Sequence, residues 1–235
     1  MLKKLSLLFL LISITSTSYA NLLQSGFTVE YDVNYNGMEL GVSKRSLLFV
    51  SDQKAIYKAE TVPEGFASLI IQETIKEISN ILITRGNVTP SQYIMTKNKR
   101  GKIEDVTIDF NWKEKTITNS YSKKIQPLKE NTHDLLSLQL NIMQDLQRNK
   151  KSMLYQVATK KHNRSYNLNV EKEELLETPM GEYKTVKLVA SSPEGKSQFI
   201  FWCAKSFEFL PIKIQKINDR GDKVSFILRS FAVQK

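Results

Sequence analysis

Residues 27–37 read Phe27-Thr-Val-Glu-Tyr-Asp-Val-Asn-Tyr-Asn-Gly37. Apolar or aromatic side chains occupy every second position from Phe27 to Tyr35, and polar side chains occupy the positions between them. This alternation predicts a half-buried strand, because neighbouring side chains of a strand point to opposite faces of the sheet. Asn36-Gly37 suits the positive φ angles of a tight hairpin turn, so a second strand is expected to return antiparallel over about 39–50.

The same period of two continues through most of the chain. It is clearest at Val106, Ile108, Phe110 and Trp112, which fall on one face of a predicted strand. Residues 66–84 fit both a helix and a strand, and their many isoleucines favour a short turn or helix near 65–70 followed by a strand over about 72–84. Further strands are predicted near 54–62, 92–97, 116–122, 153–160, 165–176, 182–191, 196–204, 209–217 and 222–233.

One segment has a helical period instead. Leu135, Leu138, Ile142 and Leu146 recur at helical spacing and predict a helix over about 133–148. Thr132 or Asp134 is expected to cap its start by accepting a hydrogen bond from a free backbone N–H. The apolar face is wide, so the helix should be buried against the sheet.

These elements predict a mainly β fold with about ten to twelve antiparallel strands and one main helix. Strands with one apolar face must bury that face, and a strongly curved sheet or open barrel that clasps the helix does so. A sandwich or a closed barrel meets the same requirement. Residues 21–235 have the length of a single domain, and they show no internal repeat or linker.

The first twenty residues have the layout of a secretory signal peptide. Lys3 and Lys4 precede a short apolar run, and small residues lead to Ala20, after which cleavage is expected. Export to the periplasm of a Gram-negative-type bacterium is the expected destination. The apolar run is too short to span a bilayer, and no later segment is long and apolar enough to do so. The net charge of +10 falls to +8 when Lys3 and Lys4 are lost.

Several short motifs resemble a known family. They are Tyr31–Gly37 followed by Leu40-Gly41, the segment His133–Leu138, Thr178–Tyr183 with Lys187, and Leu210–Ile214. In order and spacing they are similar to the exported bacterial proteins grouped as domain of unknown function 3108. The resemblance implies an envelope location and gives no activity and no catalytic residues. The predicted arrangement also resembles the open barrels of periplasmic lipoprotein carriers, a likeness of fold that does not determine function.

The sequence offers little for catalysis. His133 and His162 are far apart in the sequence, so no metal site or cofactor is expected. Cys203 lies in an apolar strand and is expected to be buried and unpaired. Adjacent or paired acids could still do acid–base work, which leaves a hydrolase with a carboxylate-lined cleft as an alternative. The candidate acids are Glu173 with Glu174, and Asp105 with Asp109.

A non-catalytic binding or carrier module for an apolar or amphipathic envelope ligand, such as a lipid, is therefore the preferred hypothesis. Its candidate ligand-binding residues are Phe66, Leu69, Phe110, Trp112, Leu138, Ile142 and Trp202, although the same residues could simply fill the core. The alternative is an envelope assembly or interaction factor that contacts other envelope proteins through a basic surface patch of Lys99, Arg100 and Lys102. No nucleic-acid partner is expected. The oligomeric state stays open.

Overall fold

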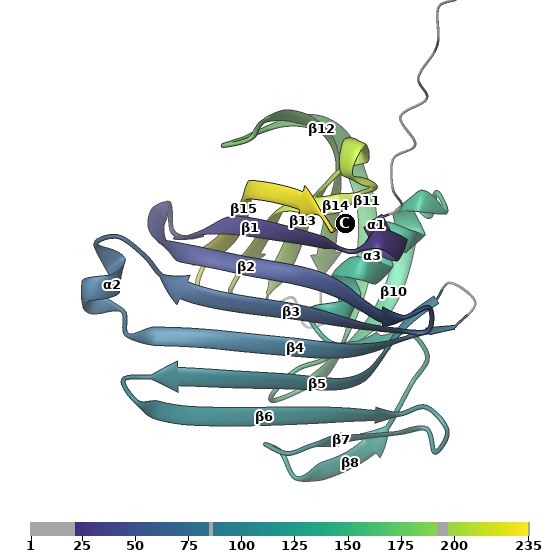
Figure 1. The fold of residues 1–235 in the computed structure, drawn as a ribbon. Helices are drawn as coiled ribbons and strands as arrows, with labels where there is room; N and C mark the ends of the chain where they lie inside the picture. The colour runs from purple at the N-terminus through teal and green to yellow at the C-terminus, as the bar shows by residue number, and fades with distance from the viewer. Residues whose placement is uncertain (1–21, 85–86, 192–196, 235) are drawn as a thin grey trace, which may run out of the picture.

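The computed structural model describes residues 22–84, 87–191 and 197–234, which form one 15-stranded sheet with few helices (Figure 1). The predicted signal peptide lies outside the described residues, so its cleavage after Ala20 and the export it implies remain predictions. The strands are β1 (Phe27–Tyr35), β2 (Met38–Ser51), β3 (Lys54–Pro63), β4 (Glu73–Thr84), β5 (Asn87–Lys99), β6 (Lys102–Asn111), β7 (Thr116–Asn119), β8 (Lys124–Pro127), β9 (Thr132–His133), β10 (Ser152–Ala158), β11 (Asn163–Thr178), β12 (Gly181–Ser191), β13 (Gln198–Ala204), β14 (Leu210–Ile217) and β15 (Lys223–Val233). The helices are α1 (Leu22–Ser25), α2 (Ala67–Ile70) and α3 (Ser137–Gln147).

The sheet consists of two meanders joined at β1. Strands β1 to β8 follow one another outward in sequence order, and β15 back to β9 do the same on the other side of β1. The predicted hairpin is present, with Tyr35 opposite Met38, and the pairing of β1 with β15 brings the two ends of the domain together. All pairs are antiparallel except β9 with β10.

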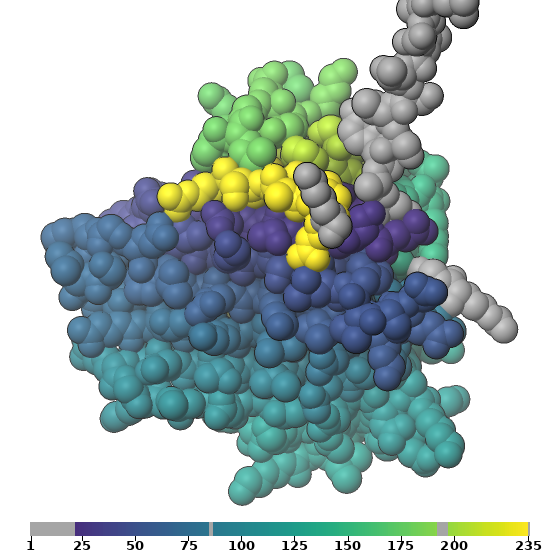
Figure 2. All heavy atoms as spheres, in the orientation of Figure 1, coloured from purple at the N-terminus to yellow at the C-terminus, as the bar shows by residue number. Residues whose placement is uncertain are grey.

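The two meanders curl around α3, so that β1–β8 form a front half and β9–β15 a back half (Figure 1). In the space-filling view the front strands make a continuous surface, above which part of the β11–β12 hairpin protrudes (Figure 2). The β7–β8 hairpin of one half contacts the β10–β11 turn of the other: Asn119 Nδ2 donates to the Thr159 carbonyl at 3.2 Å, and Asn163 Nδ2 donates to Gln126 Oε1 at 2.6 Å. The sheet is nevertheless not closed into a barrel.

This architecture confirms the predicted fold class, a curved antiparallel sheet around one main helix. The described strands outnumber the ten to twelve predicted, because β8 and β9, which were not predicted, are only four and two residues long. Alternation over so few positions cannot be recognised in a sequence. The ambiguous stretch 66–84 also has the predicted form, with α2 followed by β4.

Helix α3 begins later than predicted, because residues 132–133 are used by β9. Asp134, one of the two predicted caps, accepts hydrogen bonds from the backbone N–H groups of Leu136 at 2.8 Å and Ser137 at 2.9 Å. Thr132, the other, instead donates its hydroxyl to the Lys129 carbonyl at 2.7 Å. The carboxyl group of Asp134 therefore organises the turn that leads into the helix.

The predicted burial of α3 is confirmed on two faces. Leu140 and Met143 pack into a core shared with the front half. Leu138 and Ile142 pack into a second core, formed with the back half. The helix thus separates two apolar clusters, and each buried aliphatic side chain contributes about 1.5–3 kcal/mol to stability.

Gly41 allows the long strand β2 to pass close to β3. A Cβ at this position would lie 2.0 Å from the Val62 carbonyl oxygen, and φ is +158°. No other residue fits there without a shift of backbone. The pairing of β1 with β2 changes register beside it, between Val33 and Asn34, which is typical of a bulge that bends a strand.

Candidate functional site

A small apolar cavity lies between α3 and the inner face of the back half of the sheet. Its volume is about 130 Å³. Most of its lining side chains are aliphatic or aromatic, and three are polar. The apolar lining comprises Leu135, Leu136, Leu138, Val157, Tyr166, Leu168, Ala190, Phe199, Phe201, Ile214 and Phe226, and the polar lining comprises Arg45, Glu77 and Gln139.

Arg45 brings a positive charge to this cavity. It lies on β2 at the same parity as the buried Leu47 and is itself only 6% exposed. Its Nη1 donates to Gln139 Oε1 on α3 at 2.6 Å, and its guanidinium carbon lies 4.7 Å from the ring centre of Tyr31 and 4.8 Å from that of Phe226. These ring contacts are cation–π geometry. Among the described residues no carboxylate lies within ion-pair distance of Arg45. Its direct contacts are with neutral groups, although its charge also lowers the pKa of the nearby carboxyl group of Glu77.

A buried hydroxyl without a partner lies in the same polar region. Tyr57 is fully buried, and its Oη makes no hydrogen bond within the described part of the chain. Burial raises the pKa of Tyr57, whereas the nearby charge of Arg45 lowers it. A buried polar atom of this kind costs free energy unless water or a ligand satisfies it.

Two carboxyl groups also converge here. Glu77, half-buried on β4, accepts a hydrogen bond from Tyr93 Oη at 2.5 Å, and burial raises its pKa while that bond and Arg45 lower it. Asp134 is fully buried, and its pKa is raised by burial and lowered by its four hydrogen bonds. Only Glu77 lines the cavity, because Asp134 is occupied by the start of α3.

The predicted ligand-binding residues do not gather in one place. Leu138 lines the cavity, and Ile142 lies in the same core one turn further along α3. Phe110 is buried in the other core. The other four residues lie elsewhere. Trp112 is half-buried and donates to the Pro90 carbonyl, and Trp202 does not line the cavity and contacts Lys213. Leu69 is exposed on α2, and Phe66 is exposed directly before it.

Sequence reasoning missed Arg45, Glu77 and Gln139. A signal for the first two was present, since Arg45 interrupts the inward parity of Ser43 and Leu47. Glu77 likewise shares its parity with Ser79, which is buried. A charged residue at an inward position of an otherwise apolar strand face is uncommon and indicates a special environment.

The acids considered for hydrolysis lie outside the cavity. Glu173 forms an ion pair with Lys205 at 2.6 Å, and Glu174 accepts from Trp202 Nε1 at 2.6 Å. Asp105 and Asp109 accept hydrogen bonds from Thr96 and Gln92, both at 2.7 Å. All four are therefore engaged by neighbours on the strands next to them.

The cysteine and the two histidines also lie outside the lining of the cavity. Cys203 is buried and free, as predicted, and burial raises its pKa. His133 is buried with its Nδ1 3.1 Å from Asn141 Nδ2, whereas His162 is exposed in the β10–β11 turn. No group of His, Cys, Asp or Glu side chains in the described ranges could hold a metal ion.

The predicted basic patch lies away from the cavity. Lys99, Arg100 and Lys102 are exposed at the β5–β6 turn and do not line the cavity. A larger groove of about 740 Å³ lies between α1, the β2–β3 turn and the C-terminal end of α3. It is lined by mixed polar and apolar side chains, and among the described residues no buried charge points into it.

Comparisons with known proteins find one matching family model and similar solved structures. A model of the family described as protein of unknown function (DUF3108) matches residues 30–227. A crystal structure of a β-barrel-like protein of domain of unknown function DUF1849 from Brucella abortus is similar, with a TM-score of 0.62 and 7% identity over 90% of this chain and 99% of that one. A DUF1089 family protein from Pseudomonas aeruginosa has a TM-score of 0.40 and 10% identity over 72% and 87% of the two chains. Among curated proteins, no sequence matches the chain.

Proposed function

The chain belongs to the DUF3108 family of proteins of unknown function, and for this member we propose a non-catalytic binding role in the bacterial periplasm. Its ligand is an amphipathic anion. The apolar part of that ligand lies in the cavity between α3 and the back half of the sheet, and its anionic group lies beside Arg45. The observation that carries this proposal is a buried guanidinium group at the edge of an apolar cavity, with no carboxylate of the described residues within ion-pair distance.

The size of the cavity suggests what enters it. An engineered apolar cavity of about 150 Å³ stays dry and binds benzene. The present cavity of about 130 Å³ has room for an apolar group of similar size, such as the tail of a six-carbon chain. Longer chains would need the half-buried rings of Phe199 and Phe226 to move.

The polar end favours an anion over a neutral ligand. Arg45 already donates to Gln139, and its remaining N–H groups suit a carboxylate or phosphate, which guanidinium recognises with two parallel hydrogen bonds. The unpartnered hydroxyl of Tyr57 is a further donor close to that charge. A neutral ligand would offer these donors weaker hydrogen bonds than an anion does, because hydrogen bonds to an ionised acceptor are stronger.

The same geometry favours binding over hydrolysis. Glu77 is the one acid among the described residues that line the cavity, and Tyr93 holds it through a short hydrogen bond. General acid–base hydrolysis of the kind considered from the sequence uses two carboxyl groups that flank the substrate. The cavity supplies one.

Filling the cavity is expected to abolish binding without unfolding the protein. Ala190 lies on the inner face of β12 between Leu168 and Phe199, so Ala190→Leu places its added carbons in the empty space. We expect hexanoate to bind the wild-type protein and Ala190→Leu to weaken this binding at least tenfold. A ¹H–¹⁵N NMR titration measures the affinity. The melting temperature should not fall, since filling a cavity restores packing contacts.

Two further arms make this test specific. Val189→Leu, at the neighbouring position on the outer face of β12, should bind hexanoate as the wild type does. Arg45→Met should weaken hexanoate binding and leave binding of 1-hexanol unchanged, because only the anion uses the charge. Equal affinity of the wild type for hexanoate and hexanol, or full binding by Ala190→Leu, would contradict the proposal.

A further inference from the structure

One end of the front half of the sheet carries a patch of exposed apolar side chains. The β1–β2, β3–β4 and β5–β6 connections share this end, because consecutive antiparallel strands turn alternately at the two ends (Figure 1). The apolar tips are Met38, Phe66, Leu69, Ile70 and Ile103, which expose 63%, 76%, 73%, 62% and 66% of their surface. A single exposed apolar residue is ordinary, but five at adjacent connections form a patch that indicates an interaction site.

Basic side chains lie directly beside these apolar tips. The backbone N–H of Arg100 donates to the Gln72 carbonyl at 2.8 Å, which ties the β5–β6 turn to the residues that follow α2. Lys97 and Lys99 share one acid, Glu73, at 2.7 and 3.8 Å. Arg100 and Lys102 have no acidic partner among the described residues. Acids lie at this end too: Glu39 is next to Met38, and Glu64 pairs with Arg229 at 3.0 Å. The excess of positive charge is therefore local to the β5–β6 turn, where four basic residues face the single acid Glu73 beside the exposed apolar groups.

We propose that this end of the sheet docks onto an anionic phospholipid surface. The apolar tips would enter the boundary between headgroups and acyl chains, while the basic residues contact lipid phosphates. A bilayer suits the shape of the patch, because fluid lipid can fill the spaces between separate tips. None of the helices in the described ranges is long and apolar enough to cross a membrane, and this docking requires no such helix.

Docking in this orientation would also place the cavity near the membrane. Glu73, at the docking end, and Glu77, at the cavity, are four residues apart on the same face of β4. At about 3.3 Å per residue they are separated by about 13 Å. The docking proposal does not depend on the proposed ligand. The position of the cavity near the membrane matters for ligand binding only if the docking proposal and the proposed function are both correct.

Vesicle flotation tests the docking. The wild-type protein from Asn21 onward is expected to float with vesicles of phosphatidylglycerol and phosphatidylethanolamine, and to float far less with pure phosphatidylcholine. Added salt should weaken the binding, because charge attraction to the surface is screened. Lys99→Glu with Lys102→Glu should reduce the affinity at least tenfold, since each basic residue near an anionic surface contributes roughly a factor of five. Phe66→Ser with Leu69→Ser should reduce it by a similar factor.

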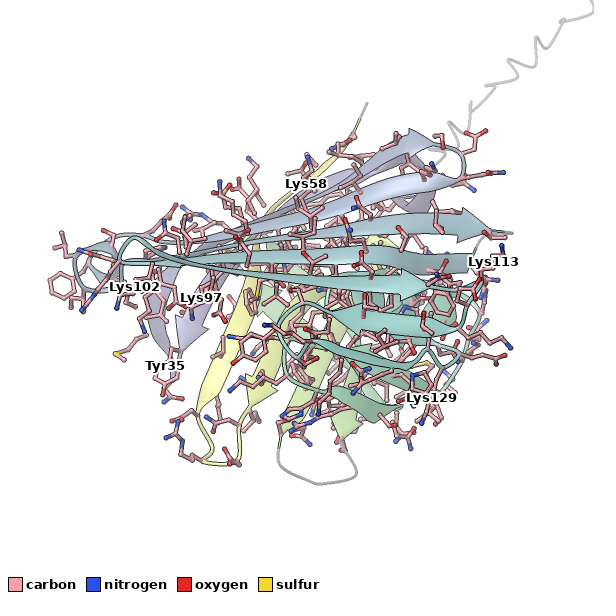
Figure 3. The ribbon with its side chains drawn as sticks, turned by 90° about the horizontal axis from the view of Figure 1, so that it is seen from below. Tyr35, Lys58, Lys97, Lys102, Lys113 and Lys129 are labelled. Carbon is pink, nitrogen blue, oxygen red and sulfur yellow. The ribbon has the colours of Figure 1, made fainter. Side chains whose placement is uncertain are left out.

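Matched double variants separate this site from general surface effects. Lys113→Glu with Lys115→Glu makes the same charge change at the opposite end of the sheet; Figure 3 labels Lys113 there and Lys97 and Lys102 at the docking end. Leu154→Ser with Leu175→Ser removes two exposed leucines elsewhere, at 59% and 58% exposure. Both control pairs should bind like the wild type.

Three results would overturn the proposal. They are equal binding to anionic and neutral vesicles, equal losses in the control pairs, and binding only to native envelope vesicles that still contain protein. The last result would assign the patch to a protein partner. Hexanoate binding in the cavity is measured without vesicles, so failure of the docking proposal and failure of the proposed function are distinguishable.

Discussion

Asp134→Ala is expected to lower the free energy of unfolding by about 4 kcal/mol. The carboxyl group is fully buried and accepts four hydrogen bonds: Oδ1 from the backbone N–H groups of Leu136 and Ser137, and Oδ2 from the hydroxyls of Ser79 at 2.7 Å and Ser137 at 2.9 Å. Alanine leaves buried donors without an acceptor, and each lost hydrogen bond to a charged or buried group costs about 1–3 kcal/mol, less when the losses overlap. The bond from Ser79 also joins α3 to β4, so the helix loses its attachment to the front half.

Urea denaturation followed by tryptophan fluorescence measures this effect. Thr132→Ala is the matched control, because it removes a single hydroxyl bond two residues away and should cost about 1 kcal/mol. Asp134→Asn keeps the size of the side chain and one strong acceptor, so it should fall between the two. If Asp134→Ala costs no more than Thr132→Ala, the carboxyl group does not hold α3 in place.

Acidification from pH 6.5 to pH 4 is expected to remove about 3 kcal/mol of stability through His133. Burial lowers the pKa of this imidazole to about 4, and the negative charge of Asp145 opposes the shift. In the unfolded chain His133 takes up a proton near pH 6.5, whereas in the folded protein it stays neutral until about pH 4. The unfolded state therefore binds more protons in this range, and stability falls as the pH falls.

The contribution of His133 is isolated by comparing variants. His133→Gln should flatten the decline of stability between pH 6.5 and 4, and His162→Gln, at the exposed histidine, should leave it unchanged. The comparison is needed because the pKa values of Glu77 and Asp134 are raised in the folded protein, so the protonation of these two groups increases stability as the pH falls. Stability is plotted against pH for the wild type and for His133→Gln. If the two curves differ only by a constant offset, His133 takes up its proton in the folded state as readily as in the unfolded chain.

Much of the fold could be predicted because its signals are local. Alternation over nine residues from Phe27 to Tyr35 defines a strand and its inner face without reference to any other part of the chain. The helical spacing of Leu138, Ile142 and Leu146 does the same for α3. Short elements such as β9, which is two residues long, depend on a partner strand for their existence and leave no such signal.

The candidate site was harder to predict, because aromatic residues are as common in cores as in binding sites. Trp202 and Phe201 are neighbours in β13, yet only Phe201 faces the cavity. Phe66 and Leu69, expected at a ligand site, are instead exposed beside the predicted basic patch. In the structure the residues of two separate sequence hypotheses, an apolar site and a basic patch, lie at the same end of the sheet, which is the surface that we propose for docking.

The sequence by itself determined which residues alternate, where the one long helix lies, and that Cys203 is buried without a disulfide partner. These properties depend on periods of two or 3.6 residues and on composition, which act within one element. The tertiary structure alone decided which faces meet. The pairing of β1 with β15 joins residues about two hundred positions apart, and with it the inner faces of both meanders close on α3. Arg45 becomes a buried charge beside an apolar cavity only because that closure removes it from water.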